Sequence, residues 1–340
     1  MKPETGQSEK SEPLAELIQT LDSWNRAVVI AHVTPDADAL GAMFSLAKVF
    51  NTAGDRSAKV SLPENSLSQR LAFLHEWANL PVAEVEDFAR ADGFVVVDTA
   101  KKSRCNIPRD LPEDWDAGRS ILNIDHHASN TGFGAINWVV GDASSASELV
   151  YHLLEAWRRP IEPLVASLLY AGIHTDTVGF SLPNTSKSAL AIAAALVAGG
   201  ADVAALGERL CRSQQLSEFK LLRIVYANTQ LAPDGRIAYS TADYREITEA
   251  GCAAADIDDQ VSIPRSLHGT RLALLFTEGV RGKTRINFRG DSGVSVLPLA
   301  KVFGGGGHDM AAGAIIDGTP DDVVARVLPE AEAYLDRLGR

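Results

Sequence analysis

The sequence contains little cysteine, no long apolar run and fewer basic than acidic residues. Its three cysteines, Cys105, Cys211 and Cys252, lie far apart among 340 residues and form no C-x-x-C pair. This spacing excludes a disulfide framework and a zinc knuckle, and it favours a reducing cytoplasm. The longest apolar stretch, residues 189–198, is well short of the ~20 residues that a membrane-spanning helix requires. Residues 1–13 lack the apolar segment of a secretory signal, so we expect a cytoplasmic protein without a membrane partner.

Basic residues are outnumbered by acidic ones. The chain has 32 Lys and Arg against 44 Asp and Glu, which gives a formal net charge of −12. This balance argues against a broad binding surface for long nucleic acid, whose phosphates it would repel. It still permits a local basic site, or acidic residues whose charge is cancelled by bound metal. With 46% hydrophobic and 22% charged residues, the composition excludes a fibrous or largely disordered chain.

The length exceeds the usual size of one domain, which is about 100 to 200 residues, so two domains are expected. In the first half, short β-branched runs alternate with segments of helical periodicity, which predicts a parallel sheet with crossover helices. Residues 162–227 are helical by pattern, and strand-like runs return after a turn at 233–235. We therefore predict an α/β protein with a loose tail (1–13), a parallel-sheet domain (14–185), a helical connector (186–229) and a smaller α/β domain (230–340).

Asp and His residues follow the predicted strands at the points where the strands end. The strand over 27–31 is followed by His32, Asp36 and Asp38. The strand over 94–97 is followed by Asp98, and the strand over 121–124 by Asp125, His126 and His127. A fourth apolar segment ends at Asp176. Because the carboxyl ends of parallel strands share one edge of the sheet, we expect these loops to bring their side chains together.

Carboxylates at such close range repel one another unless cations neutralise them. A single Asp after a strand is more often a helix cap or turn residue, but three strand ends with a fourth segment favour a metal site. Asp36 and Asp38 can diverge so that each binds a different ion, and the two oxygens of Asp98 can bridge the two ions. A mixture of imidazole and carboxylate suits Mn²⁺ better than Mg²⁺, which is the alternative.

These residues resemble the motifs of the DHH phosphoesterase superfamily. Residues 32–41 look like the first motif, Asp98 the second, residues 125–130 the third and residues 172–176 the fourth. Residues 304–313 resemble the glycine-rich signature of the companion DHHA1 domain. One departure is Ala42, where the first motif commonly has Ser after its Gly; the change removes a supporting hydroxyl and not a ligand.

The resemblance implies the following metal ligands. One ion would be held by His32, Asp36 and Asp98, and the other by Asp38, Asp98, His126 and Asp176. The resemblance also implies that His127 faces the substrate phosphate and that Asp125 supports the histidines. Asp98, Asp125 and His127 are therefore the expected catalytic residues, and two divalent cations would promote phosphoester hydrolysis.

The second domain carries an alternating basic segment. Between residues 281 and 289 the basic side chains occupy odd positions, which places them on one face of a strand. Arg285 and Arg289 are expected to contact substrate phosphate or base, because guanidinium pairs bidentately with phosphate. The glycine-rich resemblance adds the substrate-binding residues Gly305, Gly306, Gly307 and His308. In the first domain, Ser145 or Ser147 is predicted to cap the helix that follows.

The expected function is that of the nanoRNase branch of this superfamily. A two-metal phosphoesterase would hydrolyse RNA oligonucleotides of two to five nucleotides to mononucleotides and could also take 3′-phosphoadenosine 5′-phosphate. The expected partners are short RNA or nucleotides, with no long nucleic acid; homodimers are common in the family. One alternative is a phosphodiesterase of linear or cyclic dinucleotides, such as pApA or cyclic di-AMP. Another is a catalytically silent nucleotide-binding regulator.

Overall fold

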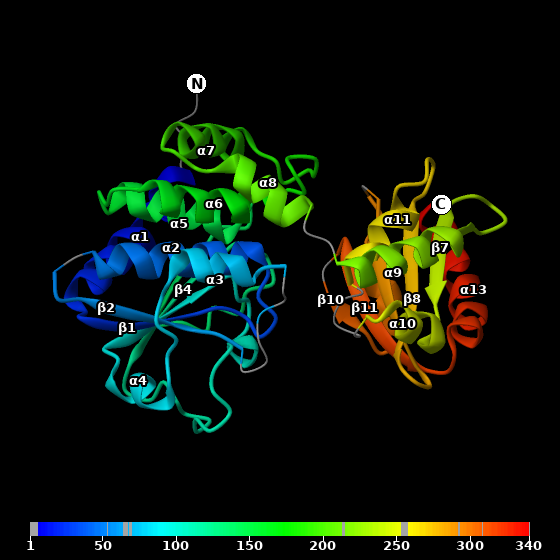
Figure 1. Ribbon diagram of the computed structural model, residues 1–340, viewed down its shortest axis with the longest axis horizontal. Helices are drawn as coiled ribbons and strands as arrows, with labels where there is room; N and C mark the ends of the chain where they lie inside the picture. Colours follow the sequence, from blue (N-terminus) through cyan, green and yellow to red (C-terminus); the bar gives the residue numbers. More distant parts are fainter. Residues whose placement is uncertain are drawn as a thin grey trace. The chain divides into compact units, whose positions relative to one another are not determined.

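The computed structural model describes residues 6–52, 54–63, 67, 70–212, 215–252, 258–291, 293–307 and 309–339. The chain divides into two compact units, Met1–Ser213 and Gln214–Arg340 (Figure 1). The helices of the predicted connector belong to both units. Helices α7 (Lys187–Ala198) and α8 (Val203–Cys211) are part of the first, and α9 (Leu216–Ala227) is part of the second.

A parallel sheet forms the centre of the first unit, as predicted, and it has five strands. Its strands are β1 (Arg26–Ile30), β2 (Ser57–Ser61), β3 (Gly93–Val97), β4 (Ser120–Asp125) and β5 (Ile136–Val139). Their order is β2-β1-β3-β4-β5. The chain therefore moves from β1 to one side and then returns to the other, so the switch point lies between β1 and β3. In open parallel sheets, ligands bind at the carboxyl ends of the strands beside such a point.

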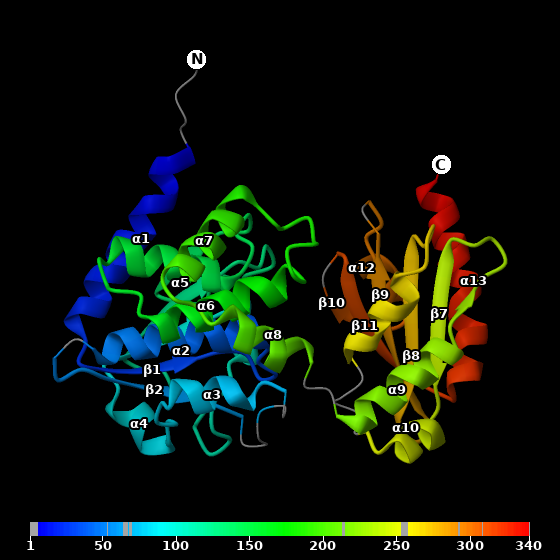
Figure 2. The same ribbon diagram turned by 45° about the horizontal axis from the view of Figure 1, so that its top comes forward.

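Helices cover both faces of this sheet, which agrees with the apolar runs in its central strands β1 and β3. Figure 2 shows α2 (Ala37–Asn51), α5 (Ala146–Ala156) and α6 (Pro163–Asp176) stacked on one side of the strands. Val29 and Val95 contribute to the core beneath them. The alternate residues Val28 and Phe94 pack on the other face, with α4 (Val85–Arg90). The remaining elements of the first unit are α1 (Gly6–Ser23), α3 (Ala72–Ala78) and the short helix η1 (Lys102–Arg104).

The expected loose tail over residues 1–13 is not borne out from Gly6 onward, because α1 spans Gly6–Ser23. Leu17 and Leu21 lie one helical turn apart and are fully buried in the core of the first unit. This apolar face anchors the helix.

The second unit contains a six-stranded mixed sheet in the order β10-β11-β9-β8-β7-β6, which agrees with the predicted smaller α/β domain. Its strands are β6 (Gln230–Leu231), β7 (Ile237–Ala242), β8 (Leu272–Val280), β9 (Lys283–Gly290), β10 (Gly306–Gly307) and β11 (Ala311–Asp317). The helices α9, α10 (Tyr244–Ala250) and α11 (Ser262–Arg265) pack on one face, and α12 (Leu297–Val302) and α13 (Pro320–Leu338) on the other. A further short helix is η3 (Asp258–Val261).

The helices in the part of the chain that the structure describes can be compared with the length and apolar composition of a membrane-spanning helix. No single helix there has both the length and the apolar character to cross a bilayer. The bent pair Lys187–Ala198 and Val203–Cys211 passes the length and composition test only when its two helices are taken together.

Candidate functional site

The loop after β1 begins the site and leads into α2. Asp36 is the N-cap of α2, and its Oδ1 accepts hydrogen bonds from the backbone N–H groups of Asp38 and Ala39, each at 3.0 Å. The capping role that an Asp often has after a strand is therefore present here. The same residue lies in a group of potential metal ligands, so capping and metal binding are compatible at this position.

Asp38 is buried, with 1% of its surface exposed, and is held by the amino end of α5. Its Oδ2 accepts from the N–H of Ala146 at 2.7 Å, and its Oδ1 accepts from the N–H of Ser147 at 2.9 Å. Ser145 is the N-cap of this helix, so Ser147 lies in its first turn. Burial raises the pKa of Asp38 well above its usual range, and repulsion from Asp98 adds to this effect. A cation would remove that cost by neutralising the carboxylate.

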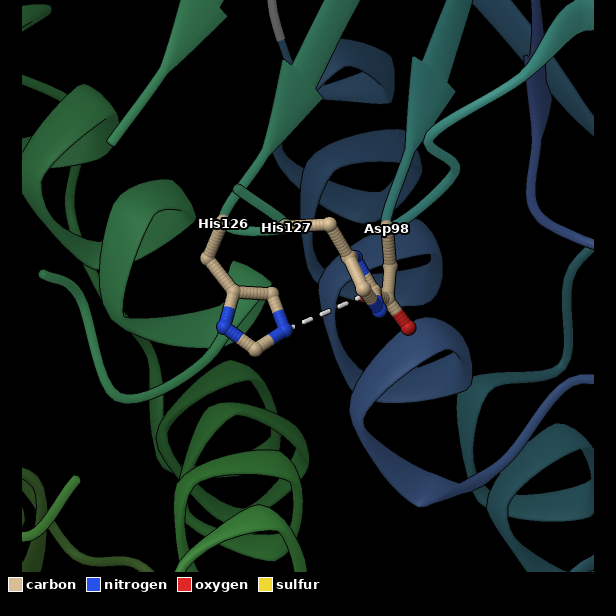
Figure 3. Close-up of side chains that lie close together, drawn as sticks. All are labelled: Asp98, His126 and His127. Carbon is tan, nitrogen blue, oxygen red and sulfur yellow. Dashed lines mark ion pairs between the residues drawn. The ribbon is translucent and has the colours of Figure 1, made fainter. Parts of the chain in front are cut away.

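Asp98 follows β3 and faces three imidazoles, two of which are drawn with it in Figure 3. Its Oδ2 lies 3.5 Å from Nε2 of His32. Its Oδ1 lies 3.4 Å from Nε2 of His126 and 3.5 Å from Nδ1 of His127. Desolvation opposes ionisation, but the neighbouring imidazoles of His126 and His32 outweigh it and lower the pKa of Asp98 below its usual range. The backbone of Asp98 is left-handed, with φ of 49°, a conformation that Asp tolerates better than most residues.

Asp125 lies behind the histidines at the end of β4 and is fully buried. Its Oδ1 accepts from the backbone N–H of His126 at 2.9 Å and lies 2.7 Å from Nδ1 of His127. Its Oδ2 accepts from Nδ2 of Asn130 at 2.6 Å. Sequence reasoning assigned no role to Asn130; its place five residues after Asp125 in the third motif was the available signal. Burial opposes protonation of His127, but the Asp125 hydrogen bond raises its pKa.

Asp176 is the last residue of α6, and its Oδ2 lies 3.7 Å from Nε2 of His126. Desolvation, opposed by nearby His126, raises the pKa of Asp176 to about 7. Burial also opposes the protonation of His126, yet Asp98 and the other carboxylates raise its pKa to about 10. Protons held by His126 and Asp176 thus offset the negative charge of the neighbouring carboxylates within a small volume. A bound cation could offset that charge in their place.

The six predicted ligands and His127 form three overlapping groups. Potential ligand atoms lie within 4.8 Å of one another in His32, Asp36 and Asp98, in Asp38, His126 and Asp176, and in Asp98, His126 and His127. Two atoms of this cluster, Nδ1 of His32 and Oδ1 of Asp98, are buried without a hydrogen-bond partner among the described residues. A buried carboxylate oxygen that lies beside two imidazoles and accepts no hydrogen bond from the described residues fits a metal-binding role, so the cluster could hold divalent metal.

Glycine allows the helices to approach closely around Asp38. A Cβ atom at Gly172 would lie 2.6 Å from Oδ1 of Asp38 and 2.0 Å from Oγ of Ser147. A Cβ atom at Gly41 would lie 2.4 Å from the carbonyl oxygen of Leu168. A side chain at either position would therefore separate α6 from the cluster.

In the second unit, Arg285 and Arg289 lie on one face of β9. Arg285 is exposed and donates through Nε to Oδ1 of Asn287 at 3.3 Å, while Arg289 is half-buried and donates to the carbonyl of Phe288 at 3.0 Å. Asn287 lies between the two arginines on the same face and is buried. Although it occupies an odd position in the basic segment, it was not singled out from the sequence, since its amide adds no charge to the pattern.

The glycines of the predicted substrate-binding loop differ in their structural surroundings. Gly306 and Gly307 form β10 and pair with Gly313 and Ala312 of β11. A Cβ atom at Gly305 would lie 2.2 Å from the carbonyl oxygen of Gly313, so this glycine permits close packing. At Gly306, a Cβ atom would meet no atom of the described residues within 4 Å, so this exposed glycine is not required by close packing there. His308 lies outside the described residues.

Comparison with known proteins agrees with this arrangement. Two family models match the chain: the DHH family N-terminal domain over residues 26–173 and the DHHA1 domain over residues 234–337. The bifunctional oligoribonuclease and PAP phosphatase NrnA of Bacillus subtilis (strain 168) is 30% identical over 310 residues, covering 88% of this chain and 92% of the relative. The chain belongs to the DHH family of phosphoesterases. The predicted resemblance is thereby confirmed, and with it the assignment to metal-dependent hydrolases.

Other members of the DHH family match over a similar length. The protein of the same name from Thermus thermophilus is 29% identical over 339 residues, covering 99% of this chain and 98% of the relative. Among solved structures, an exopolyphosphatase-related protein from Bacteroides fragilis has a TM-score of 0.87 at 22% identity, covering 97% of this chain and 98% of its own. The match to this solved structure supports the fold of both units.

Proposed function

We propose that this DHH phosphoesterase hydrolyses RNA oligonucleotides of two to five nucleotides to mononucleotides, and that it also dephosphorylates 3′-phosphoadenosine 5′-phosphate. The NrnA relatives, which match over almost their whole length, are named for these two activities. The observation that carries the proposal is the buried Asp98 carboxylate, which has imidazoles within 3.5 Å of both its oxygens at the switch point of the sheet. The strong excess of negative charge favours short substrates over long nucleic acid.

Two divalent cations are the proposed cofactors, with Mn²⁺ preferred over Mg²⁺ because the donors mix imidazole and carboxylate. The proposed ligand sets are His32, Asp36 and Asp98 for one ion, and Asp38, Asp98, His126 and Asp176 for the other. When bound, such ions activate water and neutralise charge on the phosphoryl oxygens.

The protein's own side chains orient the reacting groups. Asp125 and Asn130 fix the imidazole of His127, because Nδ1 of His127 lies 2.7 Å from Oδ1 of Asp125 and Asn130 holds the other carboxylate oxygen. The Nε2 atom of His127 is then the nitrogen that would meet a phosphate oxygen. In the second unit, Arg285 and Arg289 would bind a phosphate or base of the short substrate, and Gly306 would allow it to approach the backbone. His308 remains an expected substrate contact.

A parallel assay tests this proposal. Purified protein with Mn²⁺ is given a 5′-labelled RNA dinucleotide, 3′-phosphoadenosine 5′-phosphate, cyclic di-AMP, pyrophosphate and a long RNA. We expect rapid conversion of the dinucleotide to mononucleotides and release of phosphate from the second substrate. Rapid cleavage of the long RNA, or a clear preference for cyclic di-AMP, would contradict the proposal. Turnover of none of them would favour the silent nucleotide-binding regulator.

A further inference from the structure

The loop that follows α6 returns to the end of the same helix. Directly after Asp176 and Thr177, three consecutive residues have left-handed backbone: Val178, Gly179 and Phe180, with φ of 48°, 65° and 64°. Such a conformation is strained for a β-branched residue and persists only where surrounding contacts impose it. The turn reverses the chain, so that Asn184 lies against the carboxyl end of α6.

The side-chain amide of Asn184 links two elements that carry potential ligands. Its Nδ2 donates to the backbone carbonyl of Asp176 at 3.1 Å and to the backbone carbonyl of Ser144 at 3.0 Å. Two carbonyl acceptors fix the orientation of this amide, because an amide oxygen in the same place would face two other oxygens. Ser144 precedes the N-cap of α5, and Asp176 ends α6.

These two elements hold carboxylates of the same candidate metal group. The amino end of α5 donates two N–H groups to Asp38, as described above, while α6 carries Asp176 itself. Asp38 itself belongs to α2, but through these two hydrogen bonds its carboxylate is tied to α5, so the spacing between α5 and α6 affects the distance between the Asp38 and Asp176 carboxylates. Gly172 permits close contact between the helices, but a glycine provides no hydrogen bond to maintain the spacing.

We propose that Asn184 is a positioning residue that sets the spacing of Asp38 and Asp176 and thereby the affinity of their group for a divalent cation. The inference rests on the proposed metal-dependent function. Asn184 does not touch the cation or the substrate; it acts through the carbonyl groups of Ser144 and Asp176. Side chains that support metal ligands in this way typically change metal affinity by about ten- to a hundredfold when they are replaced.

Calorimetric titration with Mn²⁺ alone tests this inference on the full chain. Asn184→Ala and the isosteric Asn184→Asp both remove the donor, and the second variant remains informative if the first does not fold. We expect each to weaken the binding of one Mn²⁺ by about tenfold, and we expect excess Mn²⁺ to restore dinucleotide hydrolysis.

Asn51→Ala is the matched control. Asn51 ends α2 in the same unit, and its side chain likewise bonds to backbone groups, those of Ala58. This variant should lower the melting temperature without changing Mn²⁺ affinity. Wild-type Mn²⁺ affinity in both Asn184 variants, or an equal loss in Asn51→Ala, would overturn the inference. Because the titrations contain no RNA, they decide this point even if the wild-type protein fails to cleave the dinucleotide, a result that would count only against the proposed substrate.

Discussion

The acidic cluster of the first unit and the basic face of the second are built in different ways. In the cluster, Asp38 and Asp98 are buried, and backbone N–H groups or imidazoles surround their carboxylates. On β9, Arg285 is exposed and Arg289 is only half-buried. If the cluster carries the chemistry and β9 binds substrate, as proposed, the chemistry would depend on fixed positions, whereas substrate binding would tolerate adaptable side chains. Mutations in the two regions should therefore affect different kinetic parameters.

The largest expected effect comes from Asp98→Ala, which removes the carboxylate shared by both proposed ligand sets. We expect activity on every substrate to fall to background, because the ions and the imidazoles lose their common partner. Asp92→Asn is the control, since Asp92 lies before β3, at the opposite end of the strand, where it accepts from the N–H groups of Asn25 and Arg26. Initial rates at saturating Mn²⁺ measure the effect. Near-normal turnover in Asp98→Ala would remove the basis for placing the chemistry in the first unit.

The next largest effect is expected for Glu148→Gln, which should lower stability in a pH-dependent way. This variant tests the support that Glu148 gives to the amino end of α5, whose N–H groups hold Asp38. Glu148 is buried and accepts from the N–H and Oγ of Ser144; although burial raises its pKa, hydrogen bonds from His152 and Ser144 lower it to about 2. A lowered pKa stabilises the fold above the unfolded value of about 4.3, and this contribution is lost as pH falls toward the folded value.

Urea unfolding at several pH values measures that contribution. At pH 7, Glu148→Gln should cost about 1 to 3 kcal/mol of unfolding free energy, and its difference from wild type should shrink between about pH 4.3 and the folded pKa. Glu155→Gln, an exposed change on the same helix, serves as the control. A difference that is independent of pH would show that the Glu148 charge does not support the amino end of α5.

Arg289→Ala should have a smaller effect, and on a different parameter. We expect KM for the RNA dinucleotide to rise by about tenfold, with kcat and Mn²⁺ affinity unchanged, because a charge-assisted bond to the substrate is lost. Arg281→Ala provides the comparison, since Arg281 lies over the Tyr244 ring, 5.1 Å from its centre, and should leave KM unchanged. Steady-state kinetics separates the parameters. A loss of kcat at constant KM in Arg289→Ala would contradict the proposal that the second unit affects substrate binding while the first unit affects the chemistry.

The smallest expected effect is a gain in stability. Val178→Gly relieves the left-handed backbone that follows Asp176, and it should raise the free energy of unfolding by about 1 kcal/mol. The melting temperature measures this gain. The control is Val197→Gly, the same substitution within helix α7, which should be destabilising. A lower melting temperature in Val178→Gly would indicate that the Val178 side chain contributes more than its backbone strain costs.

The sequence was sufficient to predict the cluster because most of its residues follow apolar strands, and parallel topology brings such strand ends together. The order of the strands was not predicted, since it depends on pairing between distant segments. Strand β5 was also missed, because its four residues include Asn137 and lack the β-branched run of the central strands. The two-residue strand β10 consists of glycines, which indicate a loop by composition.

Supporting contacts were harder to predict than the residues of the cluster. The N–H groups that hold Asp38 belong to Ala146 and Ser147, and a backbone donor has no sequence signature. Asn184 lies in a loop without periodicity, and its role depends on a turn whose left-handed residues include Val178, a residue type that rarely adopts that conformation. Such contacts exist only once α5 and α6 have packed together.

Calorimetric titration of the wild-type protein and of Asp98→Ala with Mn²⁺ tests the central claim most directly. If the buried cluster is a two-ion centre joined by Asp98, the wild-type chain will bind two Mn²⁺ ions, and Asp98→Ala will lose tight binding of both. A single ion bound to the wild-type chain, or unchanged binding in Asp98→Ala, would contradict the account.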